Sequence, residues 1–538
     1  MTTSISNVSA NRAAQDKTAA QAATVAQKHR PHAELEQTWA GSLIFLTLCL
    51  ALVLTTLAFG TVDYWTLATF QAGAALIVVC WMVDAWRTRV LRVSNNALQW
   101  PLLGLIVLGF IQILPLGGAS DAGGALTVQV AKTLSLDPYA TRLVLVQLTA
   151  LFIYFAATLA YTDSPRRLRA LVRTIIIFGF VLAFIAVIQS LISPAKIYGI
   201  RAPQLAVPFG PFVNRHNFAG YMEMTLALPL GLMFSGAIES EKRLLYLTAI
   251  ALMGIALLMS GSRGGMISLV AMMFFLIALS GFGSKVDGMT AEGAAQVRAV
   301  VLKVGLAFTL LLAIVVAVTL IGGESSVSRF VDSVSASDPT TGRTQIWSVT
   351  LNIIKAHPVM GAGLGAYGVA YTPFDERSGA NRPEQAHNDY LQVLADAGIA
   401  GAVLGVFFIA ALFRMGFKRR RSPDIFRRGV ATGALAGCFA VLVHSFFDFT
   451  LHTTANALLF LTLAALATTG SRVERIVRRR RRRRTVPYEP GGPRTLPPAK
   501  DALQPSPDDE YEDFYEYEDE SRARFTQWWD DIRGDKRR

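Results

Sequence analysis

The feature that most constrains how this chain can fold is a series of apolar runs, each about 20 residues long. An α-helix of that length crosses the hydrocarbon core of a lipid bilayer. The chain has 538 residues, of which 52% are hydrophobic, and its pattern predicts twelve spans. The predicted spans cover residues 41–60, 64–85, 98–116, 142–162, 170–193, 216–236, 243–260, 264–282, 299–321, 390–413, 427–446 and 453–470. We therefore expect an all-α polytopic membrane protein.

Basic residues indicate how these spans are oriented. Arginine- and lysine-rich segments occupy alternate loops, at 86–92, 164–169, 241–243, 417–428 and 478–484. Loops of this kind face the cytoplasm, so both termini are expected there and the number of spans is even. The net charge of +13 is thus a signal of topology and not of nucleic-acid binding. In a bacterium the protein would lie in the inner membrane, with a long periplasmic loop at 322–389 that carries short helices.

Composition divides the chain into three parts. Residues 1–40 are rich in alanine, glutamine and threonine and are expected to form a disordered cytoplasmic segment. Residues 41–470 form the transmembrane domain. Residues 471–538 are a cytoplasmic tail in which an arginine run precedes the acidic segment 508–520. The tail is expected to be largely disordered, and its acidic segment either folds back on the arginines or binds a cytoplasmic partner.

Polar and ionisable residues gather at the predicted outer ends of the spans, which is a signal of a functional site. They come from five segments that are far apart in the sequence. The candidates are Asn214, Arg215, His216 and Asn217 at the start of the sixth span, Arg263 between the seventh and eighth, Arg343 in the long loop, His387, Asn388 and Asp389 before the tenth, and His444, Asp448 and His452 in the short turn near 447–452.

Two of the arginines suit an anionic ligand such as phosphate. Arg263 lies in the glycine-rich segment "SGSRGG", where a guanidinium can approach a ligand closely and bind it with two nitrogens. The alternative is that Arg263 extends to lipid headgroups. Arg343 begins a predicted amphipathic helix that ends before Pro358. A cation at a helix start opposes the helix dipole and indicates a negative partner nearby, although a surface arginine is an equal alternative.

Two other features have mainly structural interpretations. Glu223 falls two turns into the sixth span and is expected to face the bundle interior with a partner. The glycines of "GAGLGAYG", at 361–368, have the spacing of a dinucleotide-binding loop. No predicted strand leads into this segment, so we interpret it as a turn.

Five motifs together resemble the O-antigen ligase superfamily. His387 and Asn388, followed by nine residues and then Gly398 and Gly401, fit its His-Asn-x9-Gly-x-x-Gly pattern. The segments "FVNRHNFAGY", "SGSRGG", "GRTQIW" with "HPVMGAGLGAYG", and "HSFFDF" are similar to its other signatures, in the same order. The family often has Asn-His where this chain has His216-Asn217, which leaves the role of His216 in doubt.

The resemblance implies a membrane glycosyltransferase of the GT-C type. Its donor is a glycan on undecaprenyl diphosphate, and its acceptor is a hydroxyl of lipid A–core or of a growing polysaccharide. The chemistry is expected to need no metal and no cofactor, since no Asp-x-Asp motif lies in an outer loop. Arginines would then stabilise the departing diphosphate, and a histidine would act as base or orient the acceptor.

On this basis the candidate catalytic residues are His387, Arg263 and Arg343, with Asn388 or Asp389 holding the ring of His387. The candidate substrate-binding residues are Asn214, Arg215, Asn217, Asn388, Asp389, His444 and Asp448. Three alternatives stay open. Asn388 or Asp389 could merely cap a helix beside a bystander His387. The protein could instead be a transporter or flippase of lipid-linked glycans, or an envelope scaffold.

Overall fold

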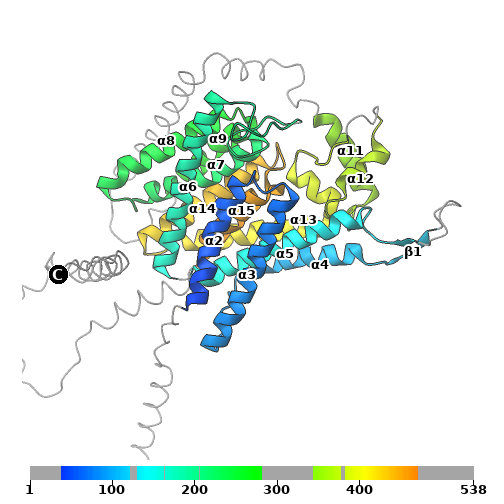
Figure 1. The fold of residues 1–538 in the computed structure, drawn as a ribbon, viewed down its shortest axis with the longest axis horizontal. Helices are drawn as coiled ribbons and strands as arrows, with labels where there is room; N and C mark the ends of the chain where they lie inside the picture. Colours follow the sequence, from blue (N-terminus) through cyan, green and yellow to red (C-terminus); the bar gives the residue numbers. More distant parts are fainter. Residues whose placement is uncertain are drawn as a thin grey trace, which may run out of the picture. The chain divides into compact units, whose positions relative to one another are not determined.

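The computed structural model describes residues 38–120, 130–162, 164–204, 206–281, 343–376 and 382–469, which lie in one compact unit (Figure 1). The predictions for residues 1–37, for the span at 299–321 and for the tail from residue 470 lie outside these ranges.

Helices make up most of the described structure. The long ones are α2 (Trp39–Leu57), α3 (Tyr64–Thr88), α4 (Gln99–Ile113), α5 (Pro138–Tyr161), α6 (Pro165–Ile192), α7 (Arg215–Ser235), α8 (Arg243–Met259), α9 (Arg263–Gly281), α11 (Arg343–Ala356), α13 (Asp389–Arg419), α14 (Ile425–His444) and α15 (Thr454–Thr468). The short ones are α12 (Tyr367–Tyr371), η1 (Ser240–Lys242), η2 (Thr372–Phe374) and η3 (Thr450–His452).

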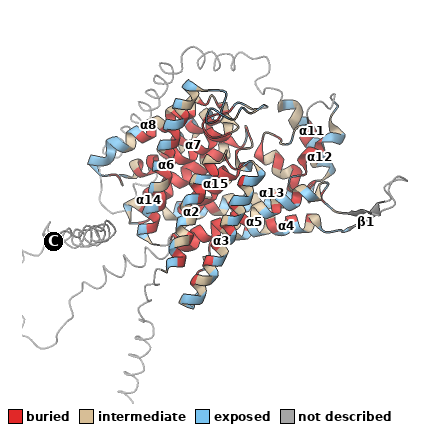
Figure 2. Cartoon of the chain, in the orientation of Figure 1, coloured by how far each residue is buried: buried red, intermediate tan, exposed pale blue. Residues whose placement is uncertain are grey.

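Each predicted span that falls on described residues coincides with one of these helices. Seven are long and apolar enough to cross a membrane, namely α2, α3, α5, α6, α8 with η1, α13 and α14. Helices α4, α9 and α15 are apolar but shorter. Several of these helices turn large apolar side chains outward, such as Leu46, Leu50 and Leu54 on α2 (Figure 2). Such a surface is unfavourable in water but favourable in lipid. Together with the long apolar helices, it makes the chain a multi-pass membrane protein.

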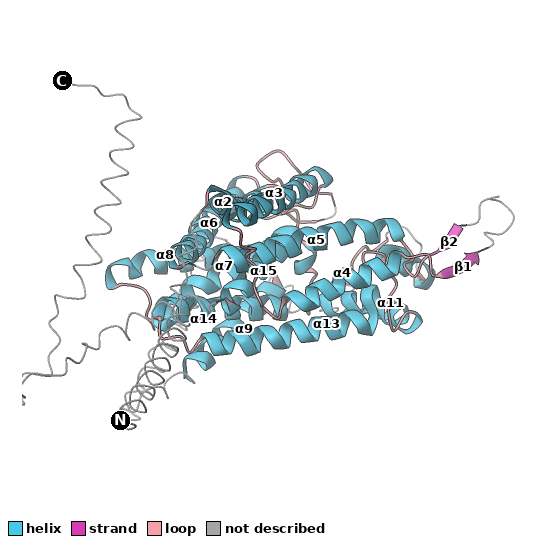
Figure 3. Ribbon diagram, turned by 90° about the horizontal axis from the view of Figure 1, so that it is seen from below, coloured by secondary structure: helices cyan, strands magenta, loops and turns pink. Residues whose placement is uncertain are grey.

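The structure departs from the purely helical prediction between α4 and α5. There β1 (Gly117–Ser120) pairs with β2 (Val130–Lys132) in an antiparallel ribbon, with Gly117 opposite Lys132 (Figure 3). The spacing of apolar residues gave no sign of these strands, because each has only three or four residues.

The core of the bundle is the contact between α7 and α14. Both helices are buried over most of their length. Glycines at every fourth position of α14, Gly429, Gly433 and Gly437, face α7. The contact is so close that a Cβ atom added at Gly231 of α7 would lie 2.2 Å from the backbone nitrogen of Gly433. We call this contact the α7–α14 seam.

The predicted amphipathic helix at the end of the long loop is α11, which buries Val349, Thr350 and Ile353. With α12 and the first turns of α13 it encloses a second, smaller apolar core. The loop therefore carries short helices, as expected, and α11 packs against α13 near the point where α13 begins.

The Gly-x-x-Gly part of the sequence pattern has a backbone explanation. Within α13, Gly398 has φ 61° and ψ −160°, so the helix is interrupted there. The segment 358–363 runs along the interruption, where Ile399 N donates to Pro358 O and Ala362 N donates to Ala395 O, both at 2.8 Å. A Cβ at position 398 would lie 2.4 Å from Val359 O, so glycine is required. The glycines near 361–368 thus belong to a turn that is fastened to α13.

Candidate functional site

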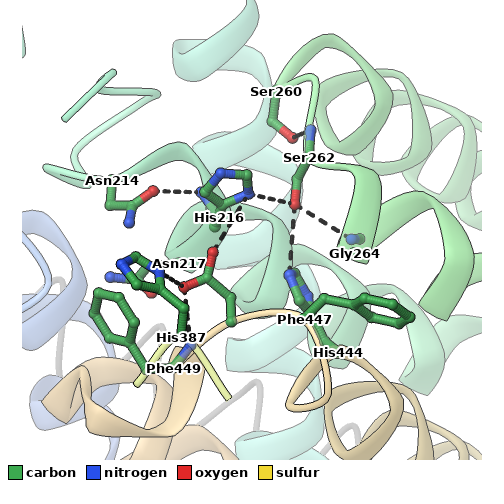
Figure 4. A network of polar contacts seen from close by, with 12 residues as sticks. Asn214, His216, Asn217, Ser260, Ser262, Gly264, His387, His444, Phe447 and Phe449 are labelled. Carbon is green, nitrogen blue, oxygen red and sulfur yellow. Dashed lines mark hydrogen bonds and ion pairs between the residues drawn. The ribbon is translucent and has the colours of Figure 1, made fainter. Parts of the chain in front are cut away.

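Several helix ends meet at one end of the bundle, which we call the polar end. Helices α7, α9, α11 and α13 begin there, and α14 ends there with His444. Figure 4 shows that side chains from the start of α7, the segments before α9 and α13, and the end of α14 with its following loop point toward one another. Four helices therefore direct the positive ends of their dipoles toward this region, which favours anions.

Asp448, in the loop between α14 and α15, is the centre of the polar end. Its side chain is only 1% exposed, and its carboxylate contacts three cationic or ionisable side chains. Oδ1 is 3.3 Å from His387 Nδ1, and Oδ2 is 3.2 Å from Arg343 Nη2 and 3.8 Å from His216 Nδ1. Burial would raise the pKa of Asp448, but the hydrogen bond from His387 and the charges of His216 and Arg343 outweigh it and lower the pKa.

His387 is held in a strained position. Its φ of 51° lies in the left-handed region, which non-glycine residues rarely adopt and which marks many functional sites. Its ring lies edge-on to Phe449, with 4.8 Å between the ring centroids, and remains 33% exposed. The imidazole is thus oriented by Asp448 and Phe449 while one side stays accessible.

The prediction that Asn388 or Asp389 holds this ring is wrong, because Asp448 takes that role. Asn388 instead caps α13, where its side chain accepts hydrogen bonds from the backbone nitrogens of Tyr390 and Leu391. Capping was the alternative for Asn388, and the structure favours it.

Asp389 forms a second carboxylate–histidine pair. It accepts hydrogen bonds from Ser445 Oγ at 2.7 Å and contacts His452 Nδ1 at 2.9 Å. Burial would lower the pKa of His452, but its hydrogen bond to Asp389 and the charge of that carboxylate raise it. This pair ties the start of α13 to the loop that carries Asp448.

Arg343 is the first residue of α11 and is 21% exposed. Its Nη1 donates to the backbone oxygen of Phe447, and its Nη2 donates to Asp448. Asp448 is therefore the negative partner that we expected for Arg343 from its position at a helix start.

The start of α7 contributes the other polar residues from the sixth predicted span. Asn214 caps the helix by accepting from the backbone nitrogen of His216 at 2.9 Å. Asn217 is buried, and its backbone oxygen accepts from Asn456 Nδ2 at 3.0 Å. Arg215 lies beside the turn at Gly261, because a Cβ added to that glycine would be 3.5 Å from its Nη1. The side chain of Asn214 therefore has a structural contact, whereas Arg215 and His216 lie only partly buried at the polar end.

Arg263 is the first residue of α9 and is partly exposed. The glycines around it have packing roles that the sequence did not reveal. A Cβ at Gly264 would lie 2.6 Å from the ring of His444, and one at Gly265 would lie 2.8 Å from the side chain of Ala219. These glycines let α9 approach α7 and α14, and so bring Arg263 to the polar end.

His444 and Glu223 were not expected to meet. His444 is the last residue of α14 and not part of the turn, and both side chains are 0% exposed. His444 Nδ1 lies 3.2 Å from Glu223 Oε2, and its Nε2 lies 3.4 Å from Ser262 Oγ. Because His444 is enclosed, it has no surface for direct contact with a substrate. Ser262 was missed altogether, although its place in "SGSRGG" beside Arg263 was a usable signal.

In the described ranges, no group of three or more histidine, cysteine, aspartate or glutamate side chains is arranged to hold a metal ion.

Comparison with known proteins gives one family match. The family model described as "O-Antigen ligase" matches residues 248–406, a segment that contains Arg263, Arg343 and His387. Asp448, His444 and Glu223 lie outside it. None of the curated proteins matches the chain.

Proposed function

Since the O-antigen ligase domain at residues 248–406 supports membership of the O-antigen ligase/polymerase superfamily, we propose that this chain is a metal-independent membrane glycosyltransferase of the GT-C type. It moves a glycan from an undecaprenyl-diphosphate donor to an acceptor hydroxyl at the periplasmic face of the bacterial inner membrane. The acceptor is lipid A–core or a growing polysaccharide chain. Such a reaction belongs to O-antigen ligase-like polysaccharide biosynthesis, which the family match supports in general.

The observation that carries the proposal is the contact of one buried carboxylate, Asp448, with both Arg343 and His387. It fixes a cation and an imidazole beside each other at the polar end. A reaction in which a diphosphate leaves and a hydroxyl attacks needs a cation for the leaving group and a group that activates or orients the acceptor, both within reach of the reacting carbon.

The diphosphate would be bound by Arg263 and Arg343 at the starts of α9 and α11, with Arg215 nearby. Helix starts and guanidinium groups both favour phosphate oxygens, and arginine binds them with two nitrogens. His387 would orient the acceptor hydroxyl or take its proton, because a neutral imidazole has one ring nitrogen that can accept a proton.

The main alternative is a transporter or flippase of lipid-linked glycans. Transporter sites lie near the middle of the bilayer at broken helices. Here the proposed catalytic residues Arg263, Arg343 and His387 lie at or just before helix starts, which favours chemistry at a membrane surface.

The test uses purified protein in detergent, a radiolabelled undecaprenyl-diphosphate glycan and an acceptor lipid, with no ion gradient. We expect glycosylated acceptor and released undecaprenyl diphosphate. A donor that stays intact in detergent, but crosses the bilayer when the protein is in liposomes, would support the transporter.

Arg263→Lys sharpens this test. Lysine keeps the charge but binds phosphate as a single point, so transfer should fall about tenfold to a hundredfold. The matched control is Arg201→Lys, because Arg201 pairs with Asp63 in another loop. Equal activity of Arg263→Lys and wild type would remove Arg263 from diphosphate binding.

A further inference from the structure

A line of polar contacts leads from the polar end into the bundle. His216 Nδ1 lies 2.8 Å from Ser262 Oγ, which lies 3.4 Å from His444 Nε2. His444 Nδ1 then lies 3.3 and 3.2 Å from the two carboxylate oxygens of Glu223. Figure 4 shows the upper part of this line, with Ser262 between the two histidines.

The line runs from a partly open group to a closed one. His216 is 21% exposed, whereas His444 and Glu223 are 0% exposed and Ser262 is buried. His216 and Glu223 are seven residues apart on α7, so they share one face about two turns, or roughly 10 Å, apart. The contacts thus connect the polar end to a carboxyl group inside the bundle.

The local structure is shaped around this line. The absence of a side chain at Gly264 leaves space for the ring of His444. The backbone nitrogen of Gly265 donates to Ser262 Oγ at 3.2 Å, which fixes the position of the hydroxyl. A simple pair of His444 and Glu223 would need neither the serine nor the glycine. An ionisable group at this depth is costly and indicates a function.

Hydrogen-bond chemistry gives the line a direction. A carboxylate only accepts, so His444 carries its proton on Nδ1 and leaves Nε2 as an acceptor. Ser262 has one O–H to donate to that nitrogen, and its oxygen accepts from His216 Nδ1. Because Nδ1 of His216 already carries a proton, His216 can take up a further proton only on its own Nε2.

We propose that His216, Ser262, His444 and Glu223 form a proton relay that carries the proton of the acceptor hydroxyl away from the polar end. This inference rests on the proposed glycosyl transfer and assigns its proton path, with His387 orienting the acceptor. The hydroxyl proton moves to His216 Nε2, and the proton on Nδ1 moves to Ser262. The serine proton moves to His444 Nε2, and the proton on His444 Nδ1 moves to Glu223, which becomes neutral. The acceptor oxygen, left with its electron pair, forms the new glycosidic bond as the diphosphate leaves.

The first experiment removes the middle of the relay. Ser262→Ala deletes the hydroxyl and adds no atoms, so transfer in the purified enzyme should fall about a hundredfold. The matched control is Ser268→Ala, because Ser268 is also buried, lies on α9 directly after the segment of Ser262, and its hydroxyl bonds only to Gly264 O. That control should keep wild-type activity.

The second experiment separates a relay from a structural role. Glu223→Gln keeps the size of the side chain and an oxygen that accepts from His444, but it cannot take a proton. Its rate should also fall about a hundredfold near neutral pH and recover as pH rises, because bulk base can then accept the proton from His216. The charged groups that face the relay, Asp448, Arg343, Arg215 and Asp389, are unchanged in this variant.

The outcomes are distinct. If wild type transfers glycan and both variants match it, the relay is wrong while the proposed function stands. If Glu223→Gln is reduced equally at every pH, its role is structural and the relay is also wrong. If wild type itself transfers no glycan, the proposed function fails first.

Discussion

Helices α7 and α14 contribute to two regions with different chemistry, the α7–α14 seam and the polar end. Along the seam, glycines bring backbones together, and the contacts are apolar and closely packed. At the polar end, the same two helices present His216 and His444 to a network of charges. The seam has no strained backbone of the kind seen at His387, where φ is positive. We infer from this difference that close packing along the seam stabilises the fold, whereas the strained backbone at the polar end lowers stability and serves the chemistry.

The largest effect should come from breaking the seam. In Gly433→Val, the new Cβ would lie 2.6 Å from Ala227 O and 2.8 Å from the Cα of Leu228, so backbones must separate. The cost should be at least about 3 kcal/mol, and little folded protein should be recovered. Size-exclusion profiles and thermal unfolding in detergent measure this. Gly405→Ala is the control, since nothing lies within 4 Å of its added Cβ. A stable Gly433→Val protein would show that the seam is looser than described.

The next effect belongs to the polar end. His387→Ala should lower transfer by about a hundredfold to ten-thousandfold while the protein stays folded. His387→Asn should be equally inactive but more stable than the alanine variant, because asparagine tolerates a positive φ. Glycan gels and unfolding temperatures report the two properties separately. Near-normal product from either variant would exclude the imidazole from the mechanism.

A smaller effect should appear as a pH dependence of stability. Asp389 raises the pKa of His452, so this pair stabilises the fold fully below the ordinary histidine pKa of about 6.5. The contribution is lost as pH rises through the raised pKa of the folded state. The difference in unfolding temperature between wild type and Asp389→Asn should therefore shrink from about pH 6 to about pH 9.

Ser445→Ala is the control for this experiment, since it removes only the serine hydrogen bond to Asp389. Its deficit should not vary with pH. If the loss of unfolding temperature in Asp389→Asn were the same at every pH, the pKa of His452 would not differ between the folded and unfolded states. The pH dependence for Asp448 has the opposite sign, because its pKa is lowered in the folded protein. Its contribution to stability is fully present above the ordinary carboxyl pKa of about 3.9 and is lost as pH falls through the lowered pKa.

The smallest effect is expected from the tail. Truncation after residue 484 keeps the arginine run and should leave transfer in membranes unchanged. In the proposed topology the site faces the periplasm, and an even number of spans would put the tail about 30 Å away across the bilayer. A cysteine placed at Tyr511 should resist an impermeant thiol reagent added from outside, whereas one at Ser378 should react. Labelling at position 511 would overturn this topology.

Helices were predictable from the sequence because apolar runs of bilayer length leave few alternatives. The separate polar motifs come together in the fold, since Arg343 and His387 both contact Asp448. Their common partner was not predictable, because Asp448 is 61 residues from His387 along the chain and no local pattern encodes that contact. The same holds for Glu223 and His444, which are 221 residues apart. In the sequence Gly264 is part of the glycine-rich segment around Arg263 and Gly398 is part of the family pattern, but each is required by a neighbour that only the fold brings close.

The central claim is that Asp448 holds Arg343 and His387 in position for glycosyl transfer, and Asp448→Asn tests it most directly. Asparagine keeps the shape but removes the charge that pairs with Arg343 and orients His387. The control is Asp137→Asn, which should preserve the cap of α5 because asparagine caps as well as aspartate does. At equal amounts of folded protein, we predict that Asp448→Asn transfers glycan at least about a hundredfold more slowly than wild type, while Asp137→Asn is unaffected. A rate for Asp448→Asn within about twofold of the wild-type rate would contradict the account, because loss of the Asp448 charge should slow transfer far more than that.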